Sequence, residues 1–208
     1  MKFLETLKQL KQIREIENTT GETLKKFTTY LHEKEKEYGK ENVYATADVD
    51  GTIAAVNSYN DDNGRFDNAL LPCFDADLNE FSKSGNIYAK AKALKTMKFV
   101  LSLFSFKKIW FLTTSEENVE IHKENFLTNN FSTKKDPIKK DHIIHVRSSN
   151  YKVEEVEKLY NSLQEKNNNK PIFLMVFEDD FDRCLQIEDT LRPKGLNVKA
   201  IHISYFVA

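Results

Sequence analysis

Three short apolar runs, each followed at once by polar residues, most constrain the fold of this chain. The runs are Val43 to Ala47, Ile109 to Leu112 and Ile172 to Phe177. Runs of this length without polar alternation are typical of strands that are buried on both faces of a sheet. Weaker strands are expected at His142 to Val146 and at Val198 to Phe206.

Helical stretches separate these strands, at roughly Ala89 to Leu103, Glu116 to Phe126 and Val153 to Glu165. Strands that alternate with helices are typical of a parallel sheet with crossover connections. The sequence therefore predicts an α/β fold with a central, mainly parallel sheet. The Asp, Gly and Asn residues between Asn60 and Phe66 predict the tip of a hairpin or flap directly after the first strand.

The N-terminal segment has a helical pattern of its own. Apolar residues recur every three or four positions over 3–16 and again over 24–31, and the second stretch ends near Gly39. We expect residues 1–40 to form a helical hairpin or bent helix packed on the core, and residues 41–208 to form the main domain.

Charge and glycine content exclude several classes of protein. The 31 Lys and Arg residues against 32 Asp and Glu give a formal net charge of −1, which argues against a general grip on nucleic acid. The spacing of the six glycines permits neither the dinucleotide fingerprint nor the phosphate-binding loop. The longest uncharged apolar run, Phe99 to Phe106, is far shorter than the roughly 20 residues of a membrane helix. No nucleic-acid partner and no membrane segment are expected.

The two cysteines and two of the histidines give no pattern of a metal site. Cys73 and Cys184 lack the C-x-x-C spacing and are expected to be packed thiols in a reducing compartment. A cysteine-based phosphatase needs an arginine shortly after its cysteine to hold the phosphate. The first arginine after Cys184 is Arg192, which is too far along the chain, so this class of enzyme is disfavoured. His142 and His145 lie three apart on a predicted strand, so they face opposite sides and cannot easily share a metal.

Polar residues at the ends of the three buried runs predict a site, because ligands of an open parallel sheet bind outside the carboxyl ends of its strands. Asp48 and Asp50 follow the first run, Thr113 and Thr114 end the second, and residues 178–180 (Glu-Asp-Asp) end the third. Two carboxylates so close repel each other, so a divalent cation is the natural way to keep both ionised. Magnesium fits, since it favours a few oxygen ligands together with water and substrate phosphate.

The turn after the first strand resembles a known motif. Gly51 would allow a sharp turn with N–H groups directed inward, and Thr52 could fix that turn by hydrogen bonding. Asp48-Val49-Asp50-Gly51-Thr52 resembles motif I (D-x-D-G-T) of the haloacid dehalogenase (HAD) superfamily, whose members are mostly magnesium-dependent phosphatases.

The other motifs of that superfamily have counterparts in the same order. The strand that ends at Thr113 is similar to the second motif, Lys152 at the head of a predicted helix resembles the lysine motif, and residues 178–180 resemble the acidic fourth motif. The resemblance covers about Val43 to Val207 and implies a Rossmann-like HAD core.

The resemblance also implies a two-step phosphoryl transfer through an aspartyl-phosphate. Asp48 would be the nucleophile, and Asp50 the general acid and base. Thr113 would hydrogen-bond the phosphoryl oxygens and Lys152 would neutralise charge on the nucleophile and the phosphoryl group. Thr114 is an alternative to Thr113, and the lysines at 139 and 140 are alternatives to Lys152.

Magnesium is the cofactor that the resemblance implies. It would be held by the Asp48 carboxylate, the Asp50 backbone carbonyl and Asp179, with Asp180 as a direct or indirect ligand. Glu178 stands where the family often has glycine, which leaves open whether Glu178 itself approaches the metal.

The substrate expectation rests on the lack of room for a cap domain. The segments between the first and second motifs and between the second and third are already filled by predicted elements, and capless members of the family often act on phosphoproteins. The flap at 53–74 carries Tyr59, Phe66 and Phe74, which could clasp an aromatic ring. We expect a protein phosphatase, with phosphotyrosine as the narrower guess, similar to bacterial effector enzymes and located in the cytoplasm or secreted into a host cell.

Two other functions are alternatives. One is a phosphatase of small phosphomonoester metabolites. The other is a HAD-like binding module with an inactive site that works through its helical N-terminus, against which the intact Asp48 and Asp50 argue.

Overall fold

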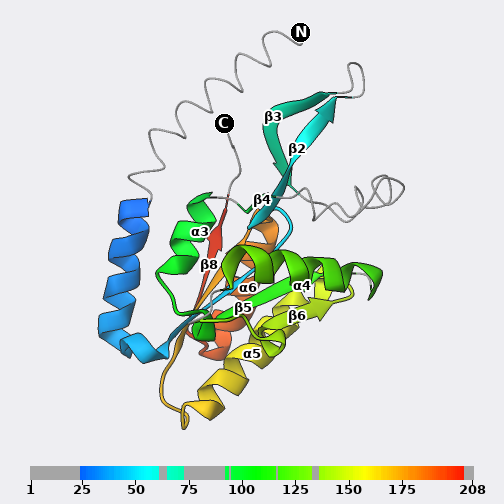
Figure 1. The fold of residues 1–208 in the computed structure, drawn as a ribbon. Coiled ribbons are helices and arrows are strands. Elements are labelled where there is room, and N and C mark those ends of the chain that lie inside the picture. Colours follow the sequence, from blue (N-terminus) through cyan, green and yellow to red (C-terminus); the bar gives the residue numbers. More distant parts are fainter. Residues whose placement is uncertain are drawn as a thin grey trace.

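The computed structural model describes residues 24–60, 65–72, 92–93, 95–115, 117–132 and 136–203. Its centre is a five-stranded sheet of order β6-β5-β1-β7-β8 (Figure 1), in which all neighbouring strands are parallel. The strands are β1 (Val43–Ala47), β5 (Ile109–Thr114), β6 (Ile143–Val146), β7 (Phe173–Glu178) and β8 (Val198–His202). The predicted α/β fold with a mainly parallel sheet is therefore confirmed.

Helices cover both faces of this sheet and enclose two hydrophobic cores. The first core lies under α3, α4 and a helix over residues 24–38, and the second lies under α5 and α6. Their bounds are α3 (Lys95–Ser102), α4 (Glu117–Phe131), α5 (Lys152–Lys166) and α6 (Phe181–Leu191). Short 3-10 turns are η1 (Lys40–Asn42), η3 (Phe106–Lys108), η4 (Lys140–His142), η5 (Ser149–Tyr151) and η6 (Arg192–Lys194).

Alternation along the strands assigns each side chain to one core. In β7, Phe173 and Phe177 belong to the first core, whereas Leu174 and Val176 belong to the second. Because successive strand residues point to opposite faces, the last residue of β7, Glu178, is directed to the face that α5 and α6 cover.

A second, smaller sheet is inserted between β1 and α3. It contains β2 (Ala54–Asn60), β3 (Arg65–Pro72) and β4 (Lys92–Ala93) in the order β3-β2-β4, with antiparallel pairing. The β2–β3 hairpin stands away from the central sheet (Figure 1) at the place where the sequence predicts a flap. Within it, Tyr59 and Phe66 are partners in register, while Phe74 lies outside the described residues.

Several element boundaries differ from those predicted. The helix expected from Ala89 begins at Lys95, because Lys92 and Ala93 pair with β2 instead. Helix α4 extends to Phe131, and α6 was not predicted.

The helix over residues 24–38 agrees with the second of the two N-terminal helices that the sequence predicts. Leu31 is buried in the first core, and the ring of Phe27 lies 5.8 Å from that of Phe177. The helix ends before Gly39, which has a φ of 86°. The predicted helix over 3–16 lies outside the described residues.

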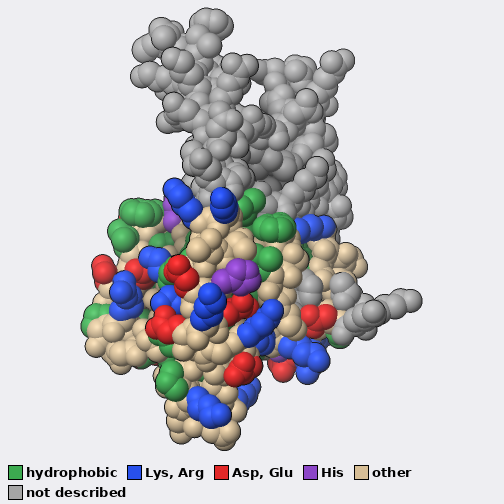
Figure 2. Space-filling view, turned by 90° about the vertical axis from the view of Figure 1, so that its left-hand side faces the viewer, with side chains coloured by type: hydrophobic (Ala, Val, Ile, Leu, Met, Phe, Trp, Pro, Cys, Tyr) green, Lys and Arg blue, Asp and Glu red, His purple; other side chains and the backbone are tan. Residues whose placement is uncertain are grey.

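Side chains of both charges are interspersed on the face shown in Figure 2, in keeping with the net charge of −1. Some charged side chains of the surface form ion pairs, such as Lys194 with Glu157 at 2.7 Å. Among the helices of the described residues, none combines the length and apolarity that crossing a membrane requires.

Candidate active site

The loop after β1 is a tight turn held by backbone hydrogen bonds. The N–H groups of Ile53 and Ala54 both donate to the carbonyl of Val49, at 3.0 and 2.9 Å. The hydroxyl of Thr52, which the sequence suggested would fix this turn, is buried without a hydrogen-bond partner among the described residues. The backbone therefore supplies the hydrogen bonds that were expected from Thr52.

Gly51 brings this turn close to the end of β7. Its φ of 75° lies in the left-handed region that favours glycine. A Cβ atom at this position would lie 2.1 Å from Oδ2 of Asp179, which is closer than any non-bonded contact allows. The absence of a side chain at Gly51 is thus what lets the carboxylate of Asp179 reach the Asp48 loop.

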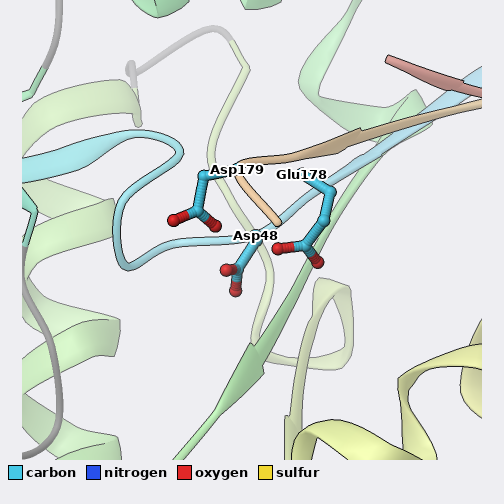
Figure 3. A group of neighbouring side chains, drawn as sticks. All are labelled: Asp48, Glu178 and Asp179. Atoms are coloured by element: carbon cyan, nitrogen blue, oxygen red, sulfur yellow. The ribbon is translucent and has the colours of Figure 1, made fainter. Parts of the chain in front are cut away.

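Three carboxylates meet at this edge of the sheet. One oxygen each from Asp48, Glu178 and Asp179 lies within 4.8 Å of the others, and the side chains converge as Figure 3 shows. The register accounts for this, because Ala47 pairs with Phe177 and the N–H of Asp48 donates to the Phe177 carbonyl at 3.0 Å. Asp48, directly after β1, and Glu178, the last residue of β7, therefore lie side by side at the ends of two neighbouring strands.

Lys152 is the cation that joins the two buried carboxylates. Its Nζ lies 2.9 Å from Oδ2 of Asp48 and 3.0 Å from Oε2 of Glu178. It is the first residue of α5 and is itself buried. The alternatives lie elsewhere: Lys140 is exposed and pairs with Glu124 at 3.2 Å, and Lys139 is exposed ahead of η4.

Burial and mutual charge shift the pKa of every member of this group. Burial raises the pKa of Asp48 to about 6 against the opposing effect of Lys152, and the charge of Glu178 adds to the rise. Burial likewise raises the pKa values of Glu178 and Asp179. Burial alone would lower the pKa of Lys152, but the carboxylates of Asp48 and Glu178 outweigh it and raise that pKa. Among the described residues, the charge of Lys152 alone does not balance those of the three carboxylates.

An unsatisfied oxygen tests whether a cation fits here. Asp48 is 7% exposed, and its Oδ1 is buried with no hydrogen-bond partner among the described residues. A buried carboxylate oxygen without a donor is costly, and a divalent cation among three carboxylates would satisfy it. The residues therefore fit magnesium, with Asp48, Glu178 and Asp179 as the available side-chain ligands.

Asp180 lies outside this group. Its side chain accepts a hydrogen bond from the N–H of Arg183 at 3.1 Å and caps the N-terminus of α6. Glu178, whose role the sequence left open, is the acidic residue that joins Asp48 and Asp179.

Asp50 and Thr113 both contact Lys123, a residue that the sequence did not indicate. Lys123 comes from α4, on the face of the sheet opposite to α5 and Lys152. Oδ2 of Asp50 is 3.4 Å from Oγ1 of Thr113, and both contact Nζ of Lys123 from α4. The backbone carbonyl of Thr114 also accepts from Lys123. The sequence does contain an indication that Lys123 is buried. Lys123 lies four residues from Val119 and four from Leu127, which places it on the buried stripe of α4.

The remaining candidates have other partners. His142 stacks on Trp110 at 4.4 Å between ring centroids, whereas Nδ1 of His145 lies 3.0 Å from Oγ of Ser115. Burial raises the pKa of the Cys184 thiol to about 12, so this cysteine is packed and unreactive at neutral pH. Cys73 lies outside the described residues.

Comparison with known proteins adds no relative. No family model, no curated protein and no solved structure matches the chain.

Proposed function

We propose that this chain is a magnesium-dependent phosphatase of the HAD type that hydrolyses phosphomonoesters through an aspartyl-phosphate on Asp48. The observation that carries the proposal is the buried Oδ1 of Asp48, which has no hydrogen-bond donor within the described part of the chain and belongs to a group with Glu178 and Asp179. A nucleophilic carboxylate beside a cation site and a buried lysine is suited to attack a phosphate dianion.

Each residue has a role in a balanced reaction. A carboxylate oxygen of Asp48 forms a bond to phosphorus while the bond to the leaving oxygen breaks, and Asp50 gives that oxygen a proton. Asp50 then takes a proton from water, which attacks phosphorus and releases inorganic phosphate and the free Asp48 carboxylate. Lys152 neutralises charge on Asp48, and Thr113 donates to a phosphoryl oxygen. Asp48, Asp179 and Glu178, with the Asp50 carbonyl that the resemblance implies, would hold magnesium, which would supply positive charge for the phosphoryl oxygens.

A phosphoprotein is the proposed substrate, with a small phosphomonoester as the alternative. Two exposed aromatic residues are close in sequence to residues of the site: Tyr151, 54% exposed, directly precedes Lys152, and Phe181, 56% exposed, lies two positions after Asp179. Exposed aromatic residues beside a reacting centre favour a substrate that brings its own apolar surface. Within phosphoproteins, phosphotyrosine is the preferred ester because its ring can stack on such residues.

The first experiment measures hydrolysis of p-nitrophenyl phosphate with magnesium and with EDTA. We expect magnesium-dependent turnover that falls by roughly four orders of magnitude in Asp48→Asn, because the nucleophile is lost. Asp189→Asn is the matched control, since Asp189 is exposed on α6 and its replacement leaves turnover unchanged. Absence of turnover with magnesium, manganese and cobalt would remove the proposal and favour the binding module.

The second experiment separates the substrate classes. A panel of phosphotyrosine and phosphoserine peptides is compared with phosphorylated sugars and nucleotides by kcat/KM. Higher kcat/KM for the peptides supports the phosphoprotein assignment, and higher values for a metabolite replace it with the alternative.

A further inference from the structure

Lys123 is a fully buried charge in the middle of a helix. Its side chain has 0% exposure, and it forms an ion pair with Asp50, whose side chain is 12% exposed. Burying an ammonium group is costly unless charge and hydrogen bonds compensate for it. The partners of Lys123 therefore indicate what it is for.

Those partners belong to the acid–base and phosphate-binding parts of the candidate site. Nζ of Lys123 contacts Oδ2 of Asp50, Oγ1 of Thr113 at 3.1 Å and the carbonyl oxygen of Thr114. An ammonium group has three N–H donors, and among the described residues these three acceptors lie within reach of them. Lys123 is thus arranged to hold protein groups instead of a phosphoryl oxygen.

The fold explains why this lysine reaches Thr113. Phe111 of β5 belongs to the first core, and Thr113, two residues further on, points to the same face. Helix α4 covers that face and contributes Val119 and Leu127 to the same core. Lys123 lies midway between these two residues on the helix, so its side chain is directed to the sheet and contacts Thr113 and Thr114 at the end of β5.

We propose that Lys123 is the positioning residue that holds the carboxyl group of Asp50 in place for proton transfer to the leaving group. The inference rests on the proposed phosphatase function and adds a residue to that site. The Thr113 hydroxyl accepts a hydrogen bond from Lys123 at 3.1 Å and donates its own proton to Oδ2 of Asp50 at 3.4 Å, so it is a second support for the Asp50 carboxyl group. Because Oδ2 of Asp50 is anchored, its carboxylate is fixed next to that hydroxyl and remains partly exposed to a substrate.

The test compares Lys123→Met with the wild type on two substrates that differ in leaving group. Phenyl phosphate needs proton donation to its leaving oxygen, whereas p-nitrophenyl phosphate needs much less. We expect kcat/KM to fall by about 100-fold on phenyl phosphate and by less than about 10-fold on p-nitrophenyl phosphate. Inhibition by inorganic phosphate should stay within about two-fold, since Lys123 does not bind the phosphoryl group. Lys158→Met, an exposed lysine of α5, is the matched control.

A double variant keeps the test valid if Lys123→Met alone fails to fold. Asp50→Asn with Lys123→Met removes both charges of the pair, so no buried charge is left alone. If Lys123 acts through Asp50, this double variant has the same kcat/KM as Asp50→Asn. A further loss of ten-fold or more would overturn the positioning role.

The two proposals fail in different ways. Equal losses on both substrates, or a ten-fold weaker inhibition by phosphate, in a wild type that is active would overturn the role of Lys123 alone. An inactive wild type would overturn the phosphatase function and this inference with it.

Discussion

Asp48 experiences opposing influences that a bound cation would reconcile. Burial and the charge of Glu178 disfavour its ionised form, while Lys152 favours it. A carboxylate in this position is protonated more readily than in water, and its unsatisfied Oδ1 adds to the cost of ionisation. Such a residue is suited to chemistry and poorly suited to holding the fold together.

Gly51 gives a prediction at the scale of one atom. Gly51→Ala would place a Cβ against Oδ2 of Asp179 and displace that carboxylate, so magnesium affinity should fall by at least about ten-fold. Isothermal titration with magnesium measures this.

Gly195→Ala is the matched control for Gly51→Ala. Gly195 has a similar φ of 82°, but a Cβ there would meet nothing within 4 Å. Both variants should lose about 1–2 kcal/mol of unfolding free energy from the left-handed backbone, whereas magnesium affinity should fall in Gly51→Ala only. Equal magnesium affinity in the two variants would contradict the contact with Asp179.

At the scale of elements, the buried strands were the most predictable part of the chain. Continuous apolar runs predicted β1, β5 and β7, because strands covered on both faces need no polar alternation. Helix α6 was missed, although Asp180 is a good N-cap, because an acidic trio after a strand suggests a site more strongly than a helix start.

Residue roles were less predictable where they depend on direction. The spacing of the motifs indicated Asp48, Lys152 and Asp179, which the structure brings to one edge. Neither the inward direction of Glu178 nor the contact of Lys123 with Asp50 follows from sequence spacing. Both depend on which face of the sheet each strand residue occupies and on which helix covers that face.

The cap of α6 gives a prediction that separates two neighbouring acids. Asp180→Ala should cost about 1 kcal/mol of unfolding free energy, since the N–H of Arg183 loses its acceptor. Asp180→Ala should also keep magnesium-dependent turnover within about three-fold. Asp179→Ala should lose magnesium binding. Urea denaturation and a magnesium titration of both variants check this, and loss of magnesium binding in Asp180→Ala would make Asp180 a ligand.

At the scale of the whole molecule, the helical layers on the two faces of the central sheet each contribute a buried lysine to the same edge of that sheet. Lys152 comes from the layer of α5 and α6 and holds Asp48, while Lys123 comes from the layer of α3 and α4 and holds Asp50. The overall charge of −1 thus conceals two buried cations at one place. The site depends on both cores being packed.

Global stability should respond to magnesium in a pH-dependent way. The pKa of Asp48 rises from 3.8 to about 6 on folding, so the folded state favours the protonated form of this residue. Without a cation, the contribution of Asp48 to the free energy of unfolding is therefore fully present below pH 3.8 and is lost as the pH rises to about 6. Magnesium binds the ionised form and should offset this loss, by about 2.7 kcal/mol at one hundred times its Kd. Thermal unfolding with magnesium and with EDTA should show a larger rise in Tm at pH 7.5 than at pH 5.

Asp48→Asn is the control for this pH effect, because it removes the titrating group. It should show little rise in Tm with magnesium at either pH. An equal rise in the wild type at both values would contradict the contribution of Asp48.

The turn at the end of β1 links the two sheets of the molecule. Asp50 forms a bridge with Ala54, the first residue of β2, and the N–H of Gly51 donates to the Ala54 carbonyl at 3.3 Å. The backbone of Asp50 is therefore attached directly to the first strand of the outer hairpin. If the proposed phosphatase function holds, we expect a substrate that binds the hairpin to change the position of Asp50 as well.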